Sequence, residues 1–146
     1  MPFRDLSRVR ADAGGVPGCN IVHEYASVGT DGNVMDAEGA AHPRAFGTFP
    51  RAINRFVKER GLMPFEKLLY KMTLMPAQRA GISDRGALLP GQFADLLVLD
   101  YDRLADNATY VNSHALASGI DLVVINGTIA YEDGAMTNAL VGRLLK

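Results

Sequence analysis

Residues 122–131 have the sequence LVVINGTIAY, in which Asn126-Gly127 separates two short apolar runs. Asn-Gly readily adopts the two positive φ angles of a type I′ turn, whose twist matches that of two antiparallel strands. The sequence therefore predicts a β-hairpin over residues 122–132. Glu132-Asp133-Gly134 supplies turn residues that close the hairpin.

A second apolar run precedes the hairpin, Ala94-Asp95-Leu96-Leu97-Val98-Leu99-Asp100. Its length is typical of a buried strand. A long polar loop from Tyr101 to about Gly119 follows it, and residues 141–146 form a basic tail. The C-terminal part of the chain is therefore expected to be built on β-structure.

The middle of the chain has the spacing of helices. After Pro50, apolar residues recur at helical intervals, with Thr48 as a candidate N-cap and Gly61 placed to end the helix. These apolar residues are Ile53, Phe56 and Val57.

A second helix is predicted to open at Pro64, with one apolar face. A third short turn runs from Pro76 to about Ala80 and stops at Gly81. The residues that share the face of the second helix are Phe65, Leu68, Leu69 and Met72. With the strands, these helices give a mixed α/β fold class.

The N-terminal residues 1–24 are poorly patterned, and residues 13–18 hold too many glycines and prolines for a helix. A short strand is predicted from Ile21 through Val28, ending at Asp31-Gly32 before a polar loop.

The composition narrows the classes of function. The chain has 146 residues, 48% of them apolar, and a net charge of −1, so it offers no overall field that attracts nucleic acid. No apolar run is long enough to span a membrane and no signal peptide is recognisable, so neither a nucleic acid nor a membrane is expected as a partner. Cys19 is the single cysteine and can form no disulfide within the chain, so a cytoplasmic location is expected.

Asp31, His42 and Arg44 are the chemically suggestive residues. They follow a predicted strand, where α/β proteins tend to hold their active sites. Spacing alone favours a simpler interpretation, in which Asp31-Gly32 is a turn and residues 42–50 are a loop into a helix. A carboxylate at the end of a barrel strand can bind a metal and also accept a proton from its water, so Asp31 is compatible with both roles.

Several common motifs are absent from the sequence. The histidines, His23, His42 and His114, form no His-x-His or HExxH pair, so the local metal signal is weak. The chain has no P-loop, dinucleotide fingerprint or Gly-x-Ser-x-Gly elbow. Residues 31–36 resemble a calcium loop but place Met35 where an oxygen ligand is needed.

The motifs together resemble the C-terminal portion of the N-acyl-D-amino-acid deacylases (D-aminoacylases) of the amidohydrolase superfamily. The similarity covers roughly Tyr25 to Lys146, with the motifs in the family's order. They are Val28-Gly29-Thr30-Asp31-Gly32, residues 42–51 (HPRAFGTFPR), Lys71-Met72-Thr73, residues 75–79 (MPAQR), Asp84-Arg85-Gly86, residues 91–100 (GQFADLLVLD) and Val124-Ile125-Asn126-Gly127.

This resemblance implies a fold and a chemistry. Family members hydrolyse the amide of N-acyl-D-amino acids with a zinc-dependent (β/α)₈ barrel that carries a small β-sandwich. By resemblance, residues 25–82 are the end of a TIM-like catalytic barrel, its last strand-helix unit followed by short helices. Residues 83–146 would be the C-terminal part of the sandwich. Asp31 would act at the metal and as general base, and His42 and Arg44 would contact the substrate.

The resemblance also implies that this chain lacks most of the family's site. The histidine-rich metal motifs lie upstream of the matching region, and one strand-helix unit cannot close a barrel. We therefore expect a fragment that is inactive alone and binds no zinc stably by itself, although the complete enzyme uses zinc. The alternative is a noncatalytic module that associates with itself, as a homo-oligomer, or with a partner such as an upstream barrel chain.

Overall fold

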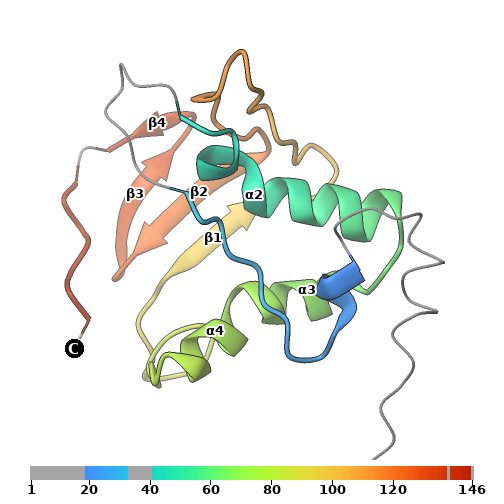
Figure 1. Cartoon of the computed structure of the whole chain (residues 1–146). Helices are drawn as coiled ribbons and strands as arrows, with labels where there is room; N and C mark the ends of the chain where they lie inside the picture. The colour runs from blue at the N-terminus through green and yellow to red at the C-terminus, as the bar shows by residue number, and fades with distance from the viewer. Residues whose placement is uncertain (1–18, 33–40, 138, 146) are drawn as a thin grey trace, which may run out of the picture.

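The computed structural model describes residues 19–32, 41–137 and 139–145. Helices come first in the chain and strands last, and the strands form one antiparallel sheet in the order β1-β2-β3-β4 (Figure 1). The elements are η1 (Cys19–Val22), α2 (Arg44–Ala52), η2 (Ile53–Glu59), α3 (Phe65–Met72), α4 (Leu74–Arg79), β1 (Leu96–Leu99), β2 (Ile120–Ile125), β3 (Thr128–Glu132) and β4 (Ala135–Met136). The mixed helix and strand class is thereby confirmed.

The predicted hairpin is formed by β2 and β3. Its turn residues Asn126 and Gly127 have φ angles of 52° and 78°, as a type I′ turn requires. A second tight turn follows at Asp133 and Gly134, with φ angles of 50° and 83°, and adds β4 to the sheet. Both turns are fixed by residues adjacent in sequence, so local chemistry was sufficient to predict them.

The predicted strand over 94–100 is present as β1, but it is not buried. Leu97 and Val98 are 53% and 48% exposed. Among the described residues only β2 pairs with β1, which is therefore an edge strand. The apolar run has the composition of a buried strand, but its side chains are partly exposed to solvent in this structure.

The first predicted helix starts earlier than expected. Helix α2 begins at Arg44, and Pro50 and Thr48 both lie inside it. Thr48 is not an N-cap, because its hydroxyl donates a hydrogen bond to the Arg44 carbonyl (2.6 Å). Pro43, with a φ of −51°, precedes the first turn and already has a helical backbone. The helix continues as the π-helical η2 and ends before Gly61, which has a φ of 57° as expected of a helix stop.

The next two helices follow the prediction more closely. Helix α3 begins directly after Pro64, as predicted. Helix α4 begins at Leu74, two residues before the predicted start at Pro76, and Gly81 follows it with a φ of 74°. No helix in the described part of the chain is long and apolar enough to cross a membrane.

The strand predicted over residues 21–32 is not formed. Residues 19–22 make a single 3₁₀ turn, and the segment after it joins no sheet (Figure 1). A strand needs a neighbour with which to exchange hydrogen bonds, and this segment lies against helices instead. Residues 1–18 and the polar loop over 33–40, including the loop that resembles a calcium site beyond Gly32, lie outside the described residues.

The core lies among the helices. Leu68 of α3 is fully buried and belongs to a cluster with residues of η1, α2, η2 and the loop before β2. The cluster consists of Ile21, Ala52, Ile53, Met63, Leu68 and Leu104. This core fixes α2, whose first turn carries Arg44, with His42 just before it in the chain.

Candidate functional site

The structure brings Asp31 and Arg44 together. A guanidinium nitrogen, Nη2 of Arg44, lies 3.0 Å from Oδ2 of Asp31. The Asp31 side chain is 89% exposed and that of Arg44 is 44% exposed, so water screens the pair and either partner can be released at little cost. Asp31 has a φ of 45°, a left-handed conformation that Asp tolerates better than most residues.

His42 is held beside the start of α2 by contacts at both ring nitrogens. Its Nδ1 accepts a hydrogen bond from the Arg44 backbone N–H (3.1 Å), and its Nε2 lies 3.2 Å from the Tyr110 hydroxyl. The Tyr110 ring also packs edge-on against the imidazole. Because Nδ1 accepts, the neutral tautomer with its proton on Nε2 satisfies both contacts. Asp31, His42 and Arg44 thus meet at one end of α2.

An ion pair between the half-exposed Arg51 and a buried carboxylate fixes α2 against the loop before β2. The Arg51 Nε lies 2.5 Å from Oδ2 of Asp106, and its Nη2 donates to the Ala108 carbonyl (2.9 Å). The Asp106 side chain is only 7% exposed. Gly47 leaves the space in which this carboxylate sits, because a Cβ at position 47 would lie 2.0 Å from Asp106 Oδ1. The motif over 42–51 therefore positions a helix as well as presenting polar groups.

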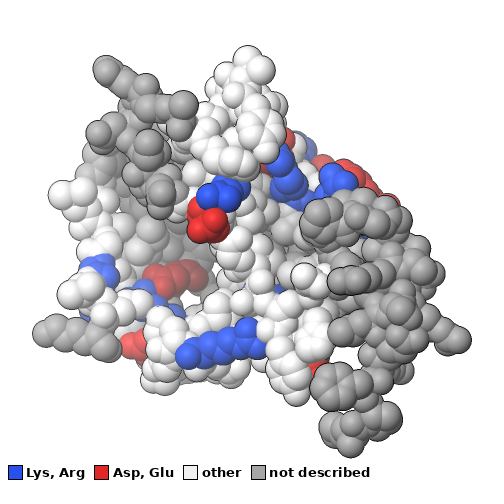
Figure 2. Space-filling view, in the orientation of Figure 1, with Lys and Arg blue, Asp and Glu red and all other residues white. Residues whose placement is uncertain are grey.

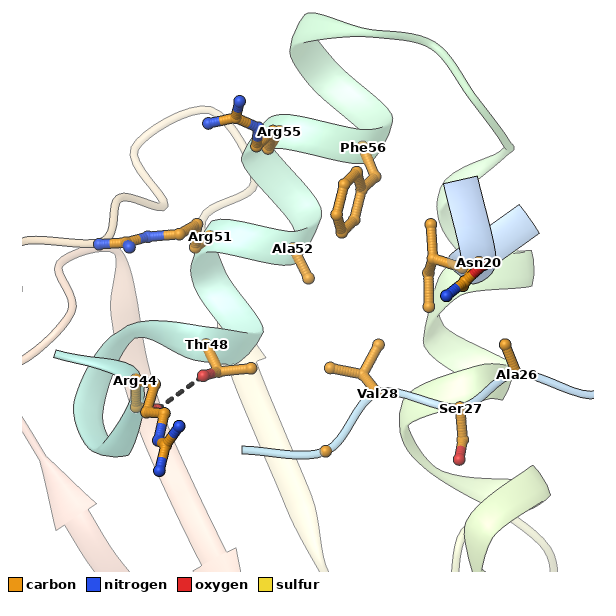
Figure 3. Close-up of a pocket in the computed structure, with 12 residues that line it drawn as sticks. Asn20, Ala26, Ser27, Val28, Arg44, Thr48, Arg51, Ala52, Arg55 and Phe56 are labelled. Carbon is orange, nitrogen blue, oxygen red and sulfur yellow. Dashed lines mark hydrogen bonds between the residues drawn. The ribbon is translucent and has the colours of Figure 1, made fainter. Parts of the chain in front are cut away.

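A cleft of about 560 Å³ lies between the segment at 26–29 and the α2–η2 helix. Arg44 lines it, whereas Asp31 and His42 do not. Figure 3 shows Val28, Ala52 and Phe56 toward the middle of this cleft, whereas the Arg51 and Arg55 side chains extend from the other side of the helix, away from it. Figure 2 shows acidic and basic side chains interspersed on this face, among much uncharged surface. The cleft therefore has an apolar middle, and Arg44, which pairs with Asp31, lies at its edge.

Lys71 is buried beneath the segment that leads to Asp31. Only 1% exposed, it donates from Nζ to the carbonyls of His23 (2.5 Å) and Ala26 (2.9 Å). Burial, together with the nearby charges of Lys67 and Arg79, lowers the pKa of Lys71. Lys71 therefore ties α3 to the segment that precedes Asp31.

The described residues do not form a complete metal site. No group of three or more His, Cys, Asp or Glu side chains that could hold a metal ion occurs among them. His114 lies apart from His42, with its Nδ1 near the Ser113 hydroxyl and its ring against Phe46. Zinc in proteins is held by three or four such ligands, so Asp31 could supply only one of the set.

The comparisons with known proteins explain this partial site. The amidohydrolase family matches residues 26–131, the region that contains Asp31, His42 and Arg44. The chain belongs to the amidohydrolase family. Its resemblance to this family in sequence is thereby confirmed.

Three of the curated relatives of this amidohydrolase chain are D-aminoacylase and two other deacylases, and the others include dihydroorotases and an adenine deaminase. D-aminoacylase from Alcaligenes xylosoxydans xylosoxydans is 40% identical over 118 residues, which are 81% of this chain and 24% of that protein. N-acyl-D-glutamate deacylase from the same organism is 37% identical over 124 residues, 85% of this chain and 25% of that protein. The chain thus spans about a quarter of the length of these relatives.

Solved structures agree with the sequence matches. A D-aminoacylase crystal structure superposes with a TM-score of 0.75 at 37% identity, over 81% of this amidohydrolase chain and 24% of that one. An N-acyl-D-glutamate deacylase from Bordetella bronchiseptica superposes with a TM-score of 0.72 at 36% identity, over 79% of this chain and 24% of that one. That structure was solved with zinc and a phosphonate mimic of the reaction's tetrahedral intermediate. Another D-aminoacylase structure, from a study of its binuclear metal center, superposes with a TM-score of 0.79 at 35% identity, over 85% of this chain and 26% of that one.

Four residues that shape the site were not predicted from the amidohydrolase sequence. Tyr110, Asp106 and Arg51 act through contacts more than 50 residues apart in sequence, and Lys71 through contacts to residues 45 and 48 positions away. Lys71 and Arg51 lie within motifs that carry the family resemblance, but the sequence did not indicate which residues they would contact. Such long-range pairs leave no periodic trace in the sequence.

Proposed function

We propose that this chain is the C-terminal part of an N-acyl-D-amino-acid deacylase, in which residues 25–82 end the catalytic barrel and residues 83–146 form part of a small β-sandwich. The observation that carries this proposal is the contact between Asp31 and Arg44, 13 positions apart, inside the family match. The relatives named as deacylases support the reaction class, hydrolysis of an amide C–N bond.

Arg44 is the group that would bind the carboxylate of an N-acyl-D-amino acid. A guanidinium offers two parallel N–H donors to a carboxylate. Asp31 occupies that position here, at 3.0 Å, and is a stand-in for such a ligand. Since both side chains are substantially exposed, a substrate carboxylate can replace Asp31 at Arg44 without a large loss of binding energy.

Asp31, once released from Arg44, would act as general base and as one metal ligand in the complete enzyme. Its carboxylate lies next to the carboxylate-binding group, which is where a base must lie to act on the substrate's neighbouring amide. Zinc, when bound in the complete enzyme, would activate water and polarise the amide carbonyl. The further ligands required are not among the described residues of this chain.

His42 would order the substrate loop and contact the substrate beside Arg44. Its imidazole is oriented by the Arg44 amide and the Tyr110 hydroxyl. Contact with a ligand through Nε2 requires Tyr110 to move, and Tyr110 is 81% exposed. His42 therefore has a defined orientation and a partner that can be displaced.

A chimera tests the proposal. The matched region of the Alcaligenes N-acyl-D-glutamate deacylase is replaced by the corresponding region of this chain, and hydrolysis of N-acetyl-D-glutamate is measured with zinc present. We expect turnover, and we expect Asp31→Asn in the chimera to lower kcat at least a hundredfold, because it removes the general base. A folded chimera without turnover, or an Asp31→Asn chimera with unchanged kcat, would show that the assignment is wrong.

Arg44→Lys in the same chimera tests the carboxylate contact. Lysine keeps the charge and loses the two-pronged geometry, so we expect KM to rise about tenfold while kcat changes less. Arg55→Lys, a substitution of another exposed arginine on the same helical segment, is the matched control and should leave KM unchanged. Equal KM values for the two variants would exclude Arg44 from carboxylate binding.

A further inference from the structure

The loop between β1 and β2 lies against α2 and is anchored there (Figure 1). Arg51 of α2 donates from Nη2 to the Ala108 carbonyl (2.9 Å). The residues after it make a tight turn, in which the Thr109 N–H donates to the Asn112 carbonyl (3.0 Å) and the Asn112 N–H to the Thr109 hydroxyl (2.9 Å). Tyr110 lies within this turn, two residues beyond an anchored carbonyl, so its backbone is held in place.

The turn places the Tyr110 side chain against His42 in a defined orientation. The two ring centroids are 5.1 Å apart with their planes at 78°, and the phenol oxygen lies 3.2 Å from His42 Nε2. The rest of the side chain faces solvent, since Tyr110 is 81% exposed. An aromatic side chain that an anchored loop holds in one orientation, yet leaves open to solvent, is suited to bind a ligand.

The hydrogen bonds around His42 leave the hydroxyl proton of Tyr110 free. His42 Nδ1 accepts from the Arg44 N–H (3.1 Å), so the neutral imidazole carries its proton on Nε2. The Nε2–H group therefore donates to the Tyr110 oxygen, and the phenolic O–H needs a different acceptor. Within the described part of the chain, the hydroxyl has no partner besides His42. A hydroxyl that already accepts a hydrogen bond is polarised into a better donor.

We propose that the Tyr110 hydroxyl donates a hydrogen bond to the substrate carboxylate that Arg44 binds. The substrate rests on the proposed function, to which this adds a binding residue from the β1–β2 loop. Tyr110 and Arg44 meet at one end of α2, because His42 is hydrogen-bonded to both. A carboxylate has about four acceptor positions, so a guanidinium that occupies two of them leaves others for a phenol. The contact of His42 with the substrate then passes through the Tyr110 hydroxyl.

Tyr110→Phe in the chimera with the Alcaligenes N-acyl-D-glutamate deacylase tests this hydrogen bond. Phenylalanine keeps the ring against His42 and loses only the hydroxyl. A hydrogen bond to a charged group contributes more to binding than one between neutral groups, so we expect KM for N-acetyl-D-glutamate to rise about tenfold. We expect kcat to change by less than about twofold, because the carboxylate is bound alike in the ground state and the transition state.

Tyr70→Phe, at a partly exposed tyrosine of α3, is the matched control and should leave KM unchanged. An unchanged KM for Tyr110→Phe overturns the proposal. So does a KM that falls, because the hydroxyl would then obstruct the site instead of binding the substrate. A fall in kcat at constant KM would mean that the hydroxyl supports the structure around His42 and does not bind the carboxylate.

Binding of acetate to the 146-residue chain without metal separates this proposal from the proposed function. The imidazole NMR signals of His42 are followed as acetate is added, and we expect a saturable shift. The dissociation constant for acetate should be about tenfold higher for Tyr110→Phe than for the unsubstituted chain or Tyr70→Phe.

The acetate and chimera results together distinguish the two proposals. Acetate binding that depends on Tyr110, beside a chimera without turnover, contradicts the assigned reaction and supports the Tyr110 contact. Turnover whose KM depends on Arg44 but not on Tyr110 contradicts only the Tyr110 contact. Acetate that shifts the His42 signals equally in all three chains, or in none of them, would also show that Tyr110 does not bind a carboxylate.

Discussion

At the scale of single residues, Gly47 shows how a position in the substrate-loop motif serves the fold. The buried Asp106 carboxylate approaches the helix at this glycine and pairs with Arg51, one turn further along. The motif over residues 42–51 was recognisable in the sequence, but its contact with Asp106 was not. Asp106 lies in a polar loop that has no periodic spacing of apolar residues to indicate what it packs against. The polar residues of the motif were recognisable by type, whereas their partners depended on the tertiary structure.

Gly47→Ala is predicted to destabilise the chain. Alanine is the better helix former, but its Cβ would clash with the Asp106 carboxylate, and displacing that buried ion pair outweighs the gain. We expect a loss of about 1–3 kcal/mol in the free energy of unfolding, measured by urea denaturation.

Gly142→Ala is the matched control for this substitution. A Cβ at position 142 has no atom within 4 Å, so we expect a change within about 0.5 kcal/mol. If the position 47 variant proved as stable as the unsubstituted chain, the contact with Asp106 would not determine the position of α2.

Lys71 provides a pH-dependent prediction at the same scale. Its pKa in the folded chain is lowered from the ordinary value of 10.5, mainly by burial. At pH values between the lowered and the ordinary pKa, the unfolded chain therefore binds more protons than the folded chain. Stability from this group therefore rises with pH in that range. We therefore compare the free energy of unfolding of the unsubstituted chain with that of Lys71→Met. As the pH rises from 7 to 10, we expect the unsubstituted chain to become more stable relative to the variant.

Lys67→Met, at an exposed lysine of the same helix, removes one of the charges that lower the pKa of Lys71 and leaves the buried amine in place. We expect its difference from the unsubstituted chain to change much less over that range. A Lys71→Met difference that stayed flat would mean that the buried amine keeps its ordinary affinity for protons.

At the scale of elements, the hairpin turn is tied to the loop before β1 by a network of polar groups. Asp95 Oδ1 accepts from the Asn126 N–H (2.8 Å), and the Arg85 guanidinium binds both the Asp95 carboxylate and the Asn126 side chain. Burial raises the pKa of Asp95, but the Asn126 amide and Arg85 outweigh it, so the pKa is lowered overall. Asn126 thus connects a local turn to the rest of the sheet.

Asp95→Asn is predicted to destabilise the chain at pH 6 and to do so by less at pH 3, below the ordinary pKa of the carboxyl. A carboxylate with a lowered pKa stabilises the fold above its ordinary value of 3.8, and this stabilisation is lost as the pH falls through the lowered value. We expect a difference of about 1 kcal/mol at pH 6, because Asp95 is partly exposed.

Asp102→Asn, a change at an exposed aspartate after β1, serves as the control and should have little effect at either pH. A difference for Asp95→Asn that is the same at pH 6 and pH 3 would mean that its charge does not stabilise the network.

The elements that were predictable are those determined by neighbouring residues. Asn126-Gly127 determined a turn, and Pro64 and Gly61 determined helix boundaries. The strand expected over 21–32 is not formed, because no strand among the described residues pairs with it. An apolar pattern in the sequence does not show whether such a neighbour is present. The start of α2 was misplaced because Pro50 was treated as a boundary, although it lies within the helix.

At the scale of the whole molecule, the chain has a family assignment and only part of a site. Asp31, His42 and Arg44 come together, as their motif suggested, while the described residues provide no further metal-binding cluster. The family was predictable because its motifs keep their order along the chain, as the match over residues 26–131 confirms. The exposure of large apolar side chains, such as Leu97 and Leu116, was not predictable, because an apolar run in the sequence does not show which of its side chains the tertiary structure covers.

The most direct measurement is hydrolysis of N-acetyl-D-glutamate by the purified 146-residue chain alone, with zinc added and the bound metal quantified. We predict no turnover above that of buffer with zinc, and no stoichiometric zinc, because Asp31 has no partner ligands within the described residues. Robust turnover that Asp31→Asn abolishes, with one or more zinc ions bound per chain, would contradict the view that this chain is one part of a larger deacylase site.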